Sequence, residues 1–97
     1  MNLNQVTLPV KDMNEAVAFY LTLGMIQIVD TPHYARFQCP DGDATFSLSL
    51  ETEEFSNSAV IYFEHEQLDE LYASLVEKGI SFEQPPTAQR YLWTEAI

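Results

Sequence analysis

Apolar and polar side chains alternate in the first stretch of the chain, Asn4–Val10. Val6, Leu8 and Val10 occupy every second position, and polar residues or proline stand between them. Because successive side chains of a strand point to opposite faces, this period of two predicts a half-buried β-strand. Pro9 has no N–H to donate to a neighbouring strand, so we expect it near a sheet edge or at a strand end.

The pattern changes to a helical period directly after this strand. Asp12 is a typical N-cap with Glu15 three residues later, and Gly24 is a typical residue just past a helix end. Between them, apolar residues recur at helical spacing at Met13, Ala16, Val17, Tyr20 and Leu23. The sequence therefore predicts an amphipathic helix that begins after Asp12 and ends at Gly24.

Three further strands complete a βαβββ pattern in the first half. They are expected at Met25–Val29, Tyr34–Cys39 and around Phe46–Leu50, with turns at Thr31–His33 and Pro40–Asp43. In the last strand, phenylalanine and leucines alternate with polar residues, which predicts one apolar face and one polar face. The polar face of that strand is formed by Ser47, Ser49 and Glu51.

The second half repeats part of this pattern. We predict a strand at Ala59–Phe63, a helix ending at Gly79, a short strand at Ile80–Phe82 and a last strand at Tyr91–Ile97. The helix rests on an apolar stripe of Leu68, Leu71, Tyr72, Leu75 and Val76. Aligning the halves so that Gly24 falls on Gly79 also places strand on strand and helix on helix, which indicates an internal duplication.

Length and composition favour one compact domain. The chain has 97 residues and a mass of 11.1 kDa, enough for a single core and too little for two independent ones. Hydrophobic residues make up 46% of it, so its high charge does not indicate disorder. We expect a single domain with a first module at residues 1–51, an acidic linker at 52–58 and a second module at 59–97.

The charge balance restricts the partners. The formal net charge is -11, from 15 acidic and 4 basic residues. Phosphate backbones and anionic membrane surfaces attract clusters of lysine and arginine. The basic residues here are scattered, at Lys11, Arg36, Lys78 and Arg90. The sequence therefore predicts neither a nucleic-acid nor a membrane partner.

The N-terminal segment and the cysteine content favour a cytoplasmic protein. Met1–Asn4 lacks the basic and apolar blocks of a secretory signal, and no apolar run approaches the roughly 20 residues that span a bilayer. A single cysteine, Cys39, agrees with a reducing compartment because it cannot form an internal disulfide. Since no activating base is evident near it, we expect Cys39 to be a buried structural residue.

Several segments resemble a known family. Gln5–Met13, Ala18–Tyr20 and Leu23–Met25 are similar to the opening strand, helix and strand of the vicinal oxygen chelate, or glyoxalase/bleomycin resistance/dioxygenase, superfamily. Tyr34–Phe37 and Pro40–Leu48 resemble the hairpin that closes its first module. Phe63–Ile80 resembles the opening of its second module. The resemblance covers almost the whole chain.

This resemblance implies an α+β fold of paired βαβββ modules that form a cleft. Enzyme members hold a divalent metal there, which chelates the oxygens of a substrate, and other members use the cleft to sequester drugs. Members commonly form homodimers, so a homodimer is expected here. The family's last hairpin would follow Ile97, so the second module is expected to be shortened at its C-terminal end.

The family's metal positions are largely replaced in this sequence. The position on the first strand falls on Gln5, and its counterpart in the second module falls on Val60, which has no ligating atom. On the last strand of the first module, Glu51 is the one credible ligand, and it is also the candidate catalytic base. The resemblance therefore leaves Gln5 and Glu51 as candidate ligands for nickel, zinc, iron or manganese, fewer than the three protein ligands of a catalytic site.

Other residue types add little catalytic chemistry. His33 and His65 are the only imidazoles, and we expect both on the surface. No Gly-rich phosphate loop, Gly-x-Ser-x-Gly turn, His-Glu-x-x-His helix or Cys-x-x-Cys pair occurs in the sequence. The expected cleft lining combines polar and aromatic side chains: Gln5, Thr7, Ser47, Ser49, Glu51, Tyr62 and Trp93.

Three functional hypotheses follow. The leading one is a small-molecule-binding or degenerate-enzyme member of the superfamily. The second is a metal-dependent lyase, isomerase or dioxygenase of the same superfamily. The third is a ferredoxin-like regulatory module, since βαββαβ also fits this length. Strand count separates the folds, because the superfamily has three strands after the first helix and the ferredoxin-like fold has two.

Overall fold

The structure is a computed structural model that describes residues 1–82, 86–88 and 94–95. The chain forms two compact units, an N-terminal unit over Met1–Ser58 and a C-terminal unit over Ala59–Ile97. The elements in chain order are β1 (Gln5–Val10), α1 (Met13–Thr22), β2 (Ile26–Asp30), β3 (Tyr34–Gln38), β4 (Thr45–Leu50), α2 (Leu68–Glu77), β5 (Thr87–Ala88) and β6 (Thr94–Glu95).

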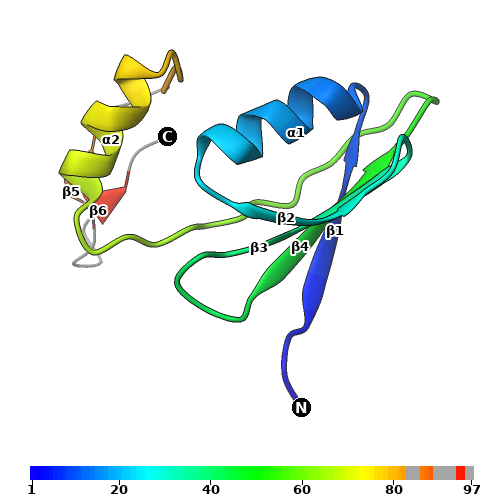
Figure 1. Ribbon diagram of the computed structural model, residues 1–97, viewed down its shortest axis with the longest axis horizontal. Helices are drawn as coiled ribbons and strands as arrows, with labels where there is room; N and C mark the ends of the chain where they lie inside the picture. The colour runs from blue at the N-terminus through cyan, green and yellow to red at the C-terminus, as the bar shows by residue number, and fades with distance from the viewer. Residues whose placement is uncertain (83–85, 89–93, 96–97) are drawn as a thin grey trace. The chain divides into compact units, whose positions relative to one another are not determined.

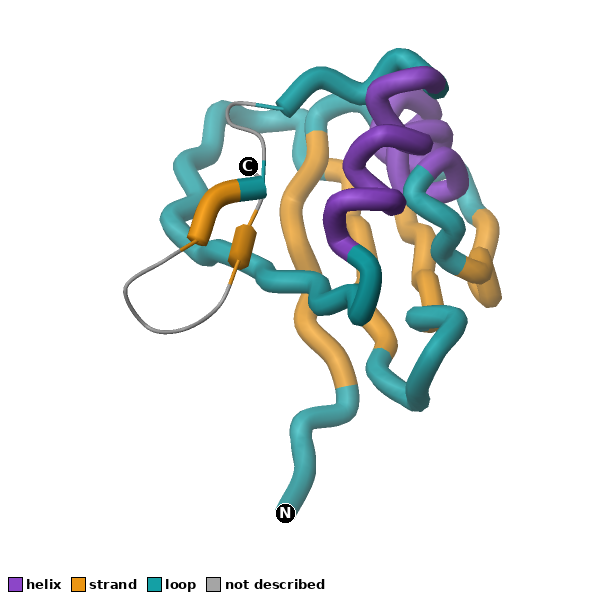
Figure 2. The backbone as a smooth tube through the Cα atoms, turned by 90° about the vertical axis from the view of Figure 1, so that its left-hand side faces the viewer, coloured by secondary structure: helices purple, strands orange, loops and turns teal. Residues whose placement is uncertain are grey.

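The N-terminal unit is a four-stranded sheet covered on one face by a helix. The strand order is β1-β4-β3-β2; β1 runs parallel to β4, and the other neighbours are antiparallel. Figure 1 shows α1 lying over one side of the sheet, and Figure 2 shows the strands beside one another. Three strands follow α1 before the unit ends, so the βαβββ prediction is confirmed and the ferredoxin-like alternative is wrong.

The local signals at both ends of α1 act as predicted. Asp12 accepts a hydrogen bond from the backbone N–H of Glu15 at 3.0 Å, which satisfies one of the unpaired donors at the helix start. Gly24 follows the C-cap residue Leu23 with φ of 95°, a conformation that side chains with a Cβ resist. β1 lies at an edge of the sheet, as expected from Pro9.

The core of this unit lies between α1 and the sheet. Ala35, Phe37 and Leu48 are fully buried, and Phe46 and Met13 are nearly so. The Tyr20 ring from α1 packs on Phe46 with ring centroids 4.8 Å apart and on Phe37 at 5.7 Å. The core residues of β3 and β4 occupy every second position of each strand. The residues between them therefore point to the other face of the sheet.

The C-terminal unit contains a helix, α2, at the place where the second half of the sequence predicts one. α2 has 10 residues, as α1 has, and Gly79 follows it with φ of 92°, as Gly24 follows α1. Leu75 is buried, and the Tyr72 and Phe82 rings lie 4.7 Å apart. β5 and β6 pair with each other in antiparallel fashion.

Two predicted strands of this unit do not form. Residues 59–63 and 80–82 are not strands in the structure. Val60 is 70% exposed and Tyr62 is 75% exposed, and no strand in the described part of the chain pairs with them. A strand needs a hydrogen-bonded neighbour, so apolar alternation alone does not produce one. Of the strand predicted at Tyr91–Ile97, only Thr94–Glu95 lies within the described residues.

Candidate functional site

The face of the sheet opposite α1 carries most of the predicted binding residues, and we call it the polar face. The parallel register of β1 and β4 sets Gln5 beside Thr45 and Thr7 beside Ser47. The antiparallel register of β3 and β4 sets Arg36 beside Ser47. The polar face is therefore formed by Gln5, Thr7, Pro9, Tyr34, Arg36, Gln38, Thr45, Ser47 and Ser49.

A chain of short hydrogen bonds crosses this face from β3 to β1. The Tyr34 Oη and Ser47 Oγ atoms lie 2.6 Å apart, and Ser47 Oγ donates to Gln5 Oε1 at 2.6 Å. Since the Ser47 proton goes to Gln5, Tyr34 must donate to Ser47. Ser47 is fully buried although it is polar, and both of its hydrogen-bonding roles are filled.

A second set of hydrogen bonds holds the Arg36 side chain against the same strand. Its Nε donates to Thr45 Oγ1 at 3.3 Å, and its Nη2 donates to the same oxygen at 2.9 Å. Nη2 also donates to Asn4 Oδ1 at 3.2 Å. Thr45 in turn donates to the backbone oxygen of Asn4 at 2.9 Å, so the residue that orients the guanidinium is itself fixed.

Four of the predicted lining residues thus share one face. Gln5 is half-buried at the start of β1, and Thr7 is exposed in the same strand. Ser47 is buried, and Ser49 is half-buried beside Tyr34 in the register of β3 and β4. This arrangement offers hydroxyl and amide groups to a ligand, with the Tyr34 ring beside them.

Glu51, the other candidate metal ligand, lies far from Gln5. Gln5 pairs with Thr45 at the start of β4, whereas Glu51 follows the last residue of β4. Along the chain, six positions separate Glu51 from Thr45, the neighbour of Gln5. At the rise of a β-strand this is a distance of about 20 Å. Bonds from a metal ion to its ligand atoms are only about 2.0–2.6 Å long, so one ion cannot be ligated by both residues in one chain.

One oxygen of each candidate ligand already accepts a hydrogen bond within the chain. Gln5 Oε1 accepts from Ser47, and Glu51 Oε1 accepts from the backbone N–H of Glu53 at 3.2 Å. Within residues 1–82, 86–88 and 94–95, no group of three His, Cys, Asp or Glu side chains could hold a metal ion. The residues that the structure describes do not fit the metal that the resemblance implies.

The remaining candidates come from a turn of the N-terminal unit and from the C-terminal unit. Tyr62 belongs to the C-terminal unit and is 75% exposed, and Trp93 lies outside the described residues. His33 is exposed in the turn between β2 and β3. His65 is exposed, and its Nδ1 accepts from the backbone N–H of Gln67 at 3.0 Å. Both histidines lie on the surface, as expected.

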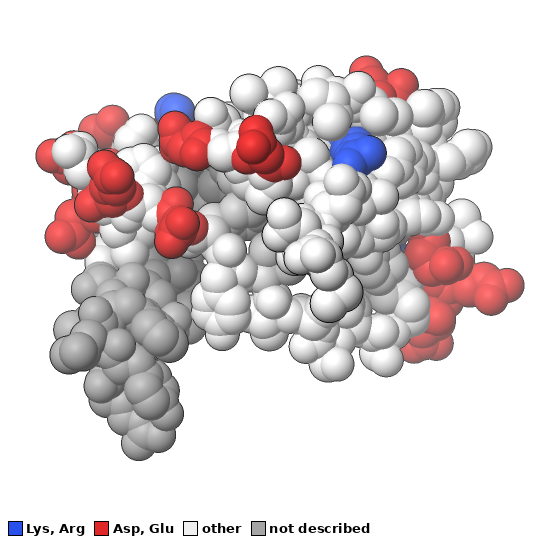
Figure 3. All heavy atoms as spheres, turned by 90° about the horizontal axis from the view of Figure 1, so that it is seen from below, with Lys and Arg blue, Asp and Glu red and all other residues white. Residues whose placement is uncertain are grey.

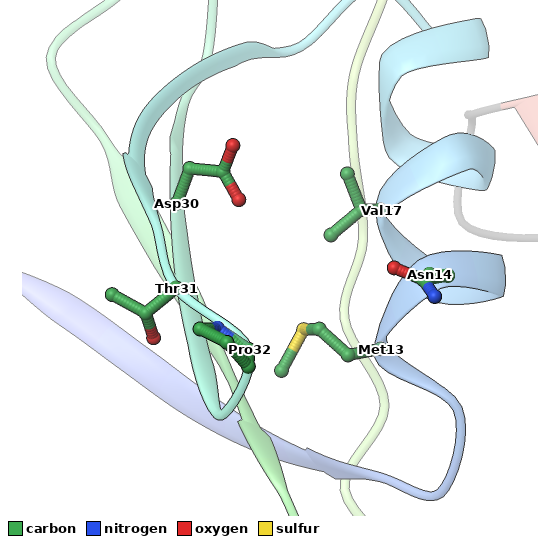
Figure 4. A pocket seen from close by; sticks show the side chains of 6 residues that line it. All are labelled: Met13, Asn14, Val17, Asp30, Thr31 and Pro32. Carbon is green, nitrogen blue, oxygen red and sulfur yellow. The ribbon is translucent and has the colours of Figure 1, made fainter.

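Two concave regions lie on the helix side of the N-terminal unit. An open pocket of about 280 Å³ is lined by Met13, Asn14 and Val17 of α1 and by Asp30, Thr31 and Pro32. Figure 4 shows Asp30 across this pocket from Val17. A wider groove of about 460 Å³ includes Lys11, whose Nζ lies 5.6 Å from the centroid of the Phe55 ring. Of the polar-face residues, Pro9 lines the groove and none lines the pocket.

The electrostatic surroundings are acidic, with no reactive thiol. Figure 3 shows acidic side chains spread over several parts of the surface in view. Cys39 is half-buried directly after β3, where burial and then the Asp41 charge raise the pKa of its thiol. A raised pKa keeps the thiol protonated and a poor nucleophile, so Cys39 adds no covalent chemistry.

Sequence reasoning missed three residues of this face. Tyr34, Arg36 and Thr45 were not among the expected lining residues, although they make most of its hydrogen bonds. The signal was present in the alternation of Tyr34 and Arg36 with Ala35 and Phe37, which places the first two opposite the core. What the alternation lacks is the register that sets Arg36 beside Ser47.

The family model for the Glyoxalase/Bleomycin resistance protein/Dioxygenase superfamily matches residues 2–95. The chain belongs to this superfamily. A solved structure of a superfamily member from Sphaerobacter thermophilus DSM 20745 superposes with a TM-score of 0.82 at 23% identity, covering 99% of this chain and 86% of that chain. The fold prediction is confirmed. A comparison with curated proteins found no match to the sequence.

Two solved superfamily structures concern bleomycin. A bleomycin-binding protein in complex with bleomycin has a TM-score of 0.69 at 20% identity, covering 99% of this chain and 87% of that chain. A bleomycin resistance determinant encoded on transposon Tn5 has a TM-score of 0.75 at 19% identity, covering 99% and 86%. At these identities the likeness shows a shared superfamily fold and nothing about the ligand.

No helix among the described residues is long and apolar enough to cross a membrane.

Proposed function

We propose that this superfamily member binds a small organic molecule at the polar face of its N-terminal unit and uses no metal there. The observation that carries the proposal is the hydrogen-bonded chain through the buried hydroxyl of Ser47. It fixes one side chain from each of β1, β3 and β4 on the face that α1 leaves open. Such a face is ordered before a ligand arrives.

Preorganisation is what makes this arrangement suited to binding. Immobilising a side chain on binding costs about 0.5–1.5 kcal/mol of free energy, and groups already held in place avoid that cost. Gln5 and Arg36 are both held by hydrogen bonds to β4. Their polar groups stand beside the half-buried Tyr34 ring, a mixture that suits a small polar-aromatic compound.

The relatives support the same class of function. A structural neighbour is a bleomycin-binding protein in complex with bleomycin, so this fold can hold an organic ligand. The metal-dependent alternative has no comparable support, because Gln5 and Glu51 of one chain lie too far apart to share an ion. We therefore favour the binding or degenerate-enzyme hypothesis.

Nuclear magnetic resonance tests the proposal most directly. The full chain, labelled with ¹⁵N, is titrated with a panel of small polar-aromatic compounds and with bleomycin. A ligand of the proposed kind should shift the signals of polar-face residues, namely Gln5, Thr7, Tyr34, Ser47 and Ser49. If every active compound shifts only residues of the helix side, the site is wrong; if no compound shifts any signal, the function is wrong.

Metal binding is checked separately. Native mass spectrometry of the purified protein is run before and after addition of nickel, zinc, iron and manganese. The proposal expects no stoichiometric ion. One ion retained per chain, lost on mutation of Gln5, would instead support the metal-dependent alternative.

A homodimer and a cytoplasmic location complete the proposal. The exposed apolar side chains of Val60 and Tyr62 offer contact area for a second copy of the chain. Light scattering at a series of concentrations tests the dimer, and a monomer throughout would contradict it. Fractionation of cells that produce the protein tests the location.

A further inference from the structure

Arg36 is the residue of the polar face that most needs an explanation. Acidic residues outnumber basic ones by 15 to 4, yet the contacts of this guanidinium among the described residues are with a hydroxyl and an amide oxygen. A half-buried guanidinium usually pairs with a carboxylate, because desolvating its charge costs free energy. No carboxylate among the described residues pairs with Arg36, so its guanidinium can take an acidic partner.

The orientation of Arg36 leaves two donors for such a partner. A guanidinium has five N–H groups in a rigid plane. The bonds to Thr45 and Asn4 use Nε and Nη2. Neither N–H of Nη1 has an acceptor among the described residues. Because the other side of the plane is fixed, Nη1 is presented in a defined direction.

Gln5 adds donors over the same strand. Its Oε1 accepts from Ser47, so its Nε2 is directed away from Ser47 and has no acceptor among the described residues. Arg36 contacts Thr45, which lies two positions before Ser47 on β4. These two contact points are roughly 7 Å apart along the strand. The unused N–H groups of Arg36 and Gln5 are donors, and the two side chains contact β4 within this short stretch.

We infer that the polar face binds the carboxylate group of a small organic acid, which accepts hydrogen bonds from Arg36 Nη1 and Gln5 Nε2. This inference rests on the proposed function and names its ligand class. A carboxylate has only acceptor atoms, and its hydrogen bonds to a guanidinium are strengthened by charge. The chain's net charge of -11 repels anions at long range, so a fixed local cation is what retains one.

A pair of isosteric probes tests the ligand class. The ¹⁵N-labelled full chain is titrated with benzoate and with benzamide, which share a ring and differ in the charged group. Benzoate should shift the Arg36 Nε–H and Gln5 side-chain amide signals and bind about tenfold or more tightly than benzamide. Equal binding of both probes at this face would overturn the inference and leave the proposed function intact. A polar face that responds to neither probe nor to the wider panel would overturn both.

Two charge-matched variants test the residue. Arg36→Met and Lys11→Met each remove one positive charge, so both change the net charge equally. Lys11 contacts the Phe55 ring outside the polar face. Benzoate affinity should fall about tenfold or more in Arg36→Met and stay unchanged in Lys11→Met.

A third variant covers the case in which Arg36→Met does not fold, which a loss of dispersion in its ¹H–¹⁵N spectrum would show. Arg36→Lys keeps the positive charge and loses the planar array of donors. Benzoate affinity should then fall severalfold. An affinity that is unchanged in a folded variant of Arg36 would overturn the assignment.

Discussion

Tyr34 and Gln5, on strands that are not neighbours, share one hydroxyl group. Each has an oxygen 2.6 Å from Ser47 Oγ, with Tyr34 donating to it and Gln5 accepting from it. The hydroxyl between them belongs to a fully buried serine on β4, the strand that lies between β1 and β3. Through this contact, the side chains of β1 and β3 are fixed relative to each other.

Replacing that hydroxyl should destabilise the fold. Ser47→Ala removes two hydrogen bonds and should lower the free energy of unfolding by about 1–2 kcal/mol. Urea denaturation measures the change. Ser49→Ala is the matched control, because Ser49 lies on the same strand face and its side chain has no hydrogen bond to a described residue. Equal effects of the two substitutions would show that the shared hydroxyl has no special role.

The aromatic core should be more sensitive than the aromatic surface. Phe37 is fully buried and stacks on Phe46 with ring centroids 5.4 Å apart. Phe37→Ala should lower the free energy of unfolding by about 3–5 kcal/mol, through lost burial and a new cavity. Phe19→Ala, in α1 at a side chain that is 43% exposed, is the control and should cost much less. Thermal or urea unfolding of both variants decides the comparison.

Stability should fall at alkaline pH because of Tyr20. Burial raises the pKa of its phenol above the usual value of 10.0, so the folded state holds this proton more tightly than the unfolded state does. The resulting stabilisation is complete below the unfolded pKa of about 10 and is lost as the pH rises through the higher folded value.

Urea unfolding at a series of values from about pH 9 to about pH 11 measures this loss. Tyr20→Phe should flatten the alkaline decline, since its ring keeps the packing without the titrating group. Tyr62→Phe removes an exposed tyrosine of the C-terminal unit and serves as the control. An alkaline decline that is the same in all three proteins would rule out Tyr20 as its source.

The two helix-ending glycines should differ from the third glycine of the chain. Gly24 and Gly79 have φ of 95° and 92°, where a Cβ strains the backbone although nothing lies within 4 Å of it. Alanine at either position should lower the free energy of unfolding by about 1 kcal/mol. Gly42→Ala is the control, since that site is equally open and has no such φ. Calorimetry on the three variants gives the order, and a Gly42 variant as destabilised as the others would contradict the explanation.

The N-terminal unit was predictable because its signals are local. Asp12 caps α1 through a residue three positions away, and Gly24 ends it through its own backbone angle. The alternation around Phe46 and Leu48 needed no partner to indicate which side is buried, and both residues are in the core. Each of these features depends on neighbours within a few positions of the chain.

The candidate site was only partly predictable because it depends on strand pairing. Thr7 and Ser47 were assigned to a polar lining from alternation, and the structure sets them beside each other. The role of Arg36 depends on the neighbour that its strand selects, which alternation does not specify. The strand predicted at residues 59–63 does not form for the same reason. These residues alternate as in a strand, but no described strand pairs with them.

The parallel pairing of β1 with β4 also has a kinetic consequence. The Ser47–Gln5 contact joins residues 42 positions apart, whereas β3 and β4 are joined by a short turn. Closing a long loop costs more entropy than closing a short one, so the β3–β4 hairpin should form early and β1 should dock late. The polar face is complete only after that last step. A ligand held by both Gln5 and Arg36 should therefore slow unfolding and leave the folding rate unchanged.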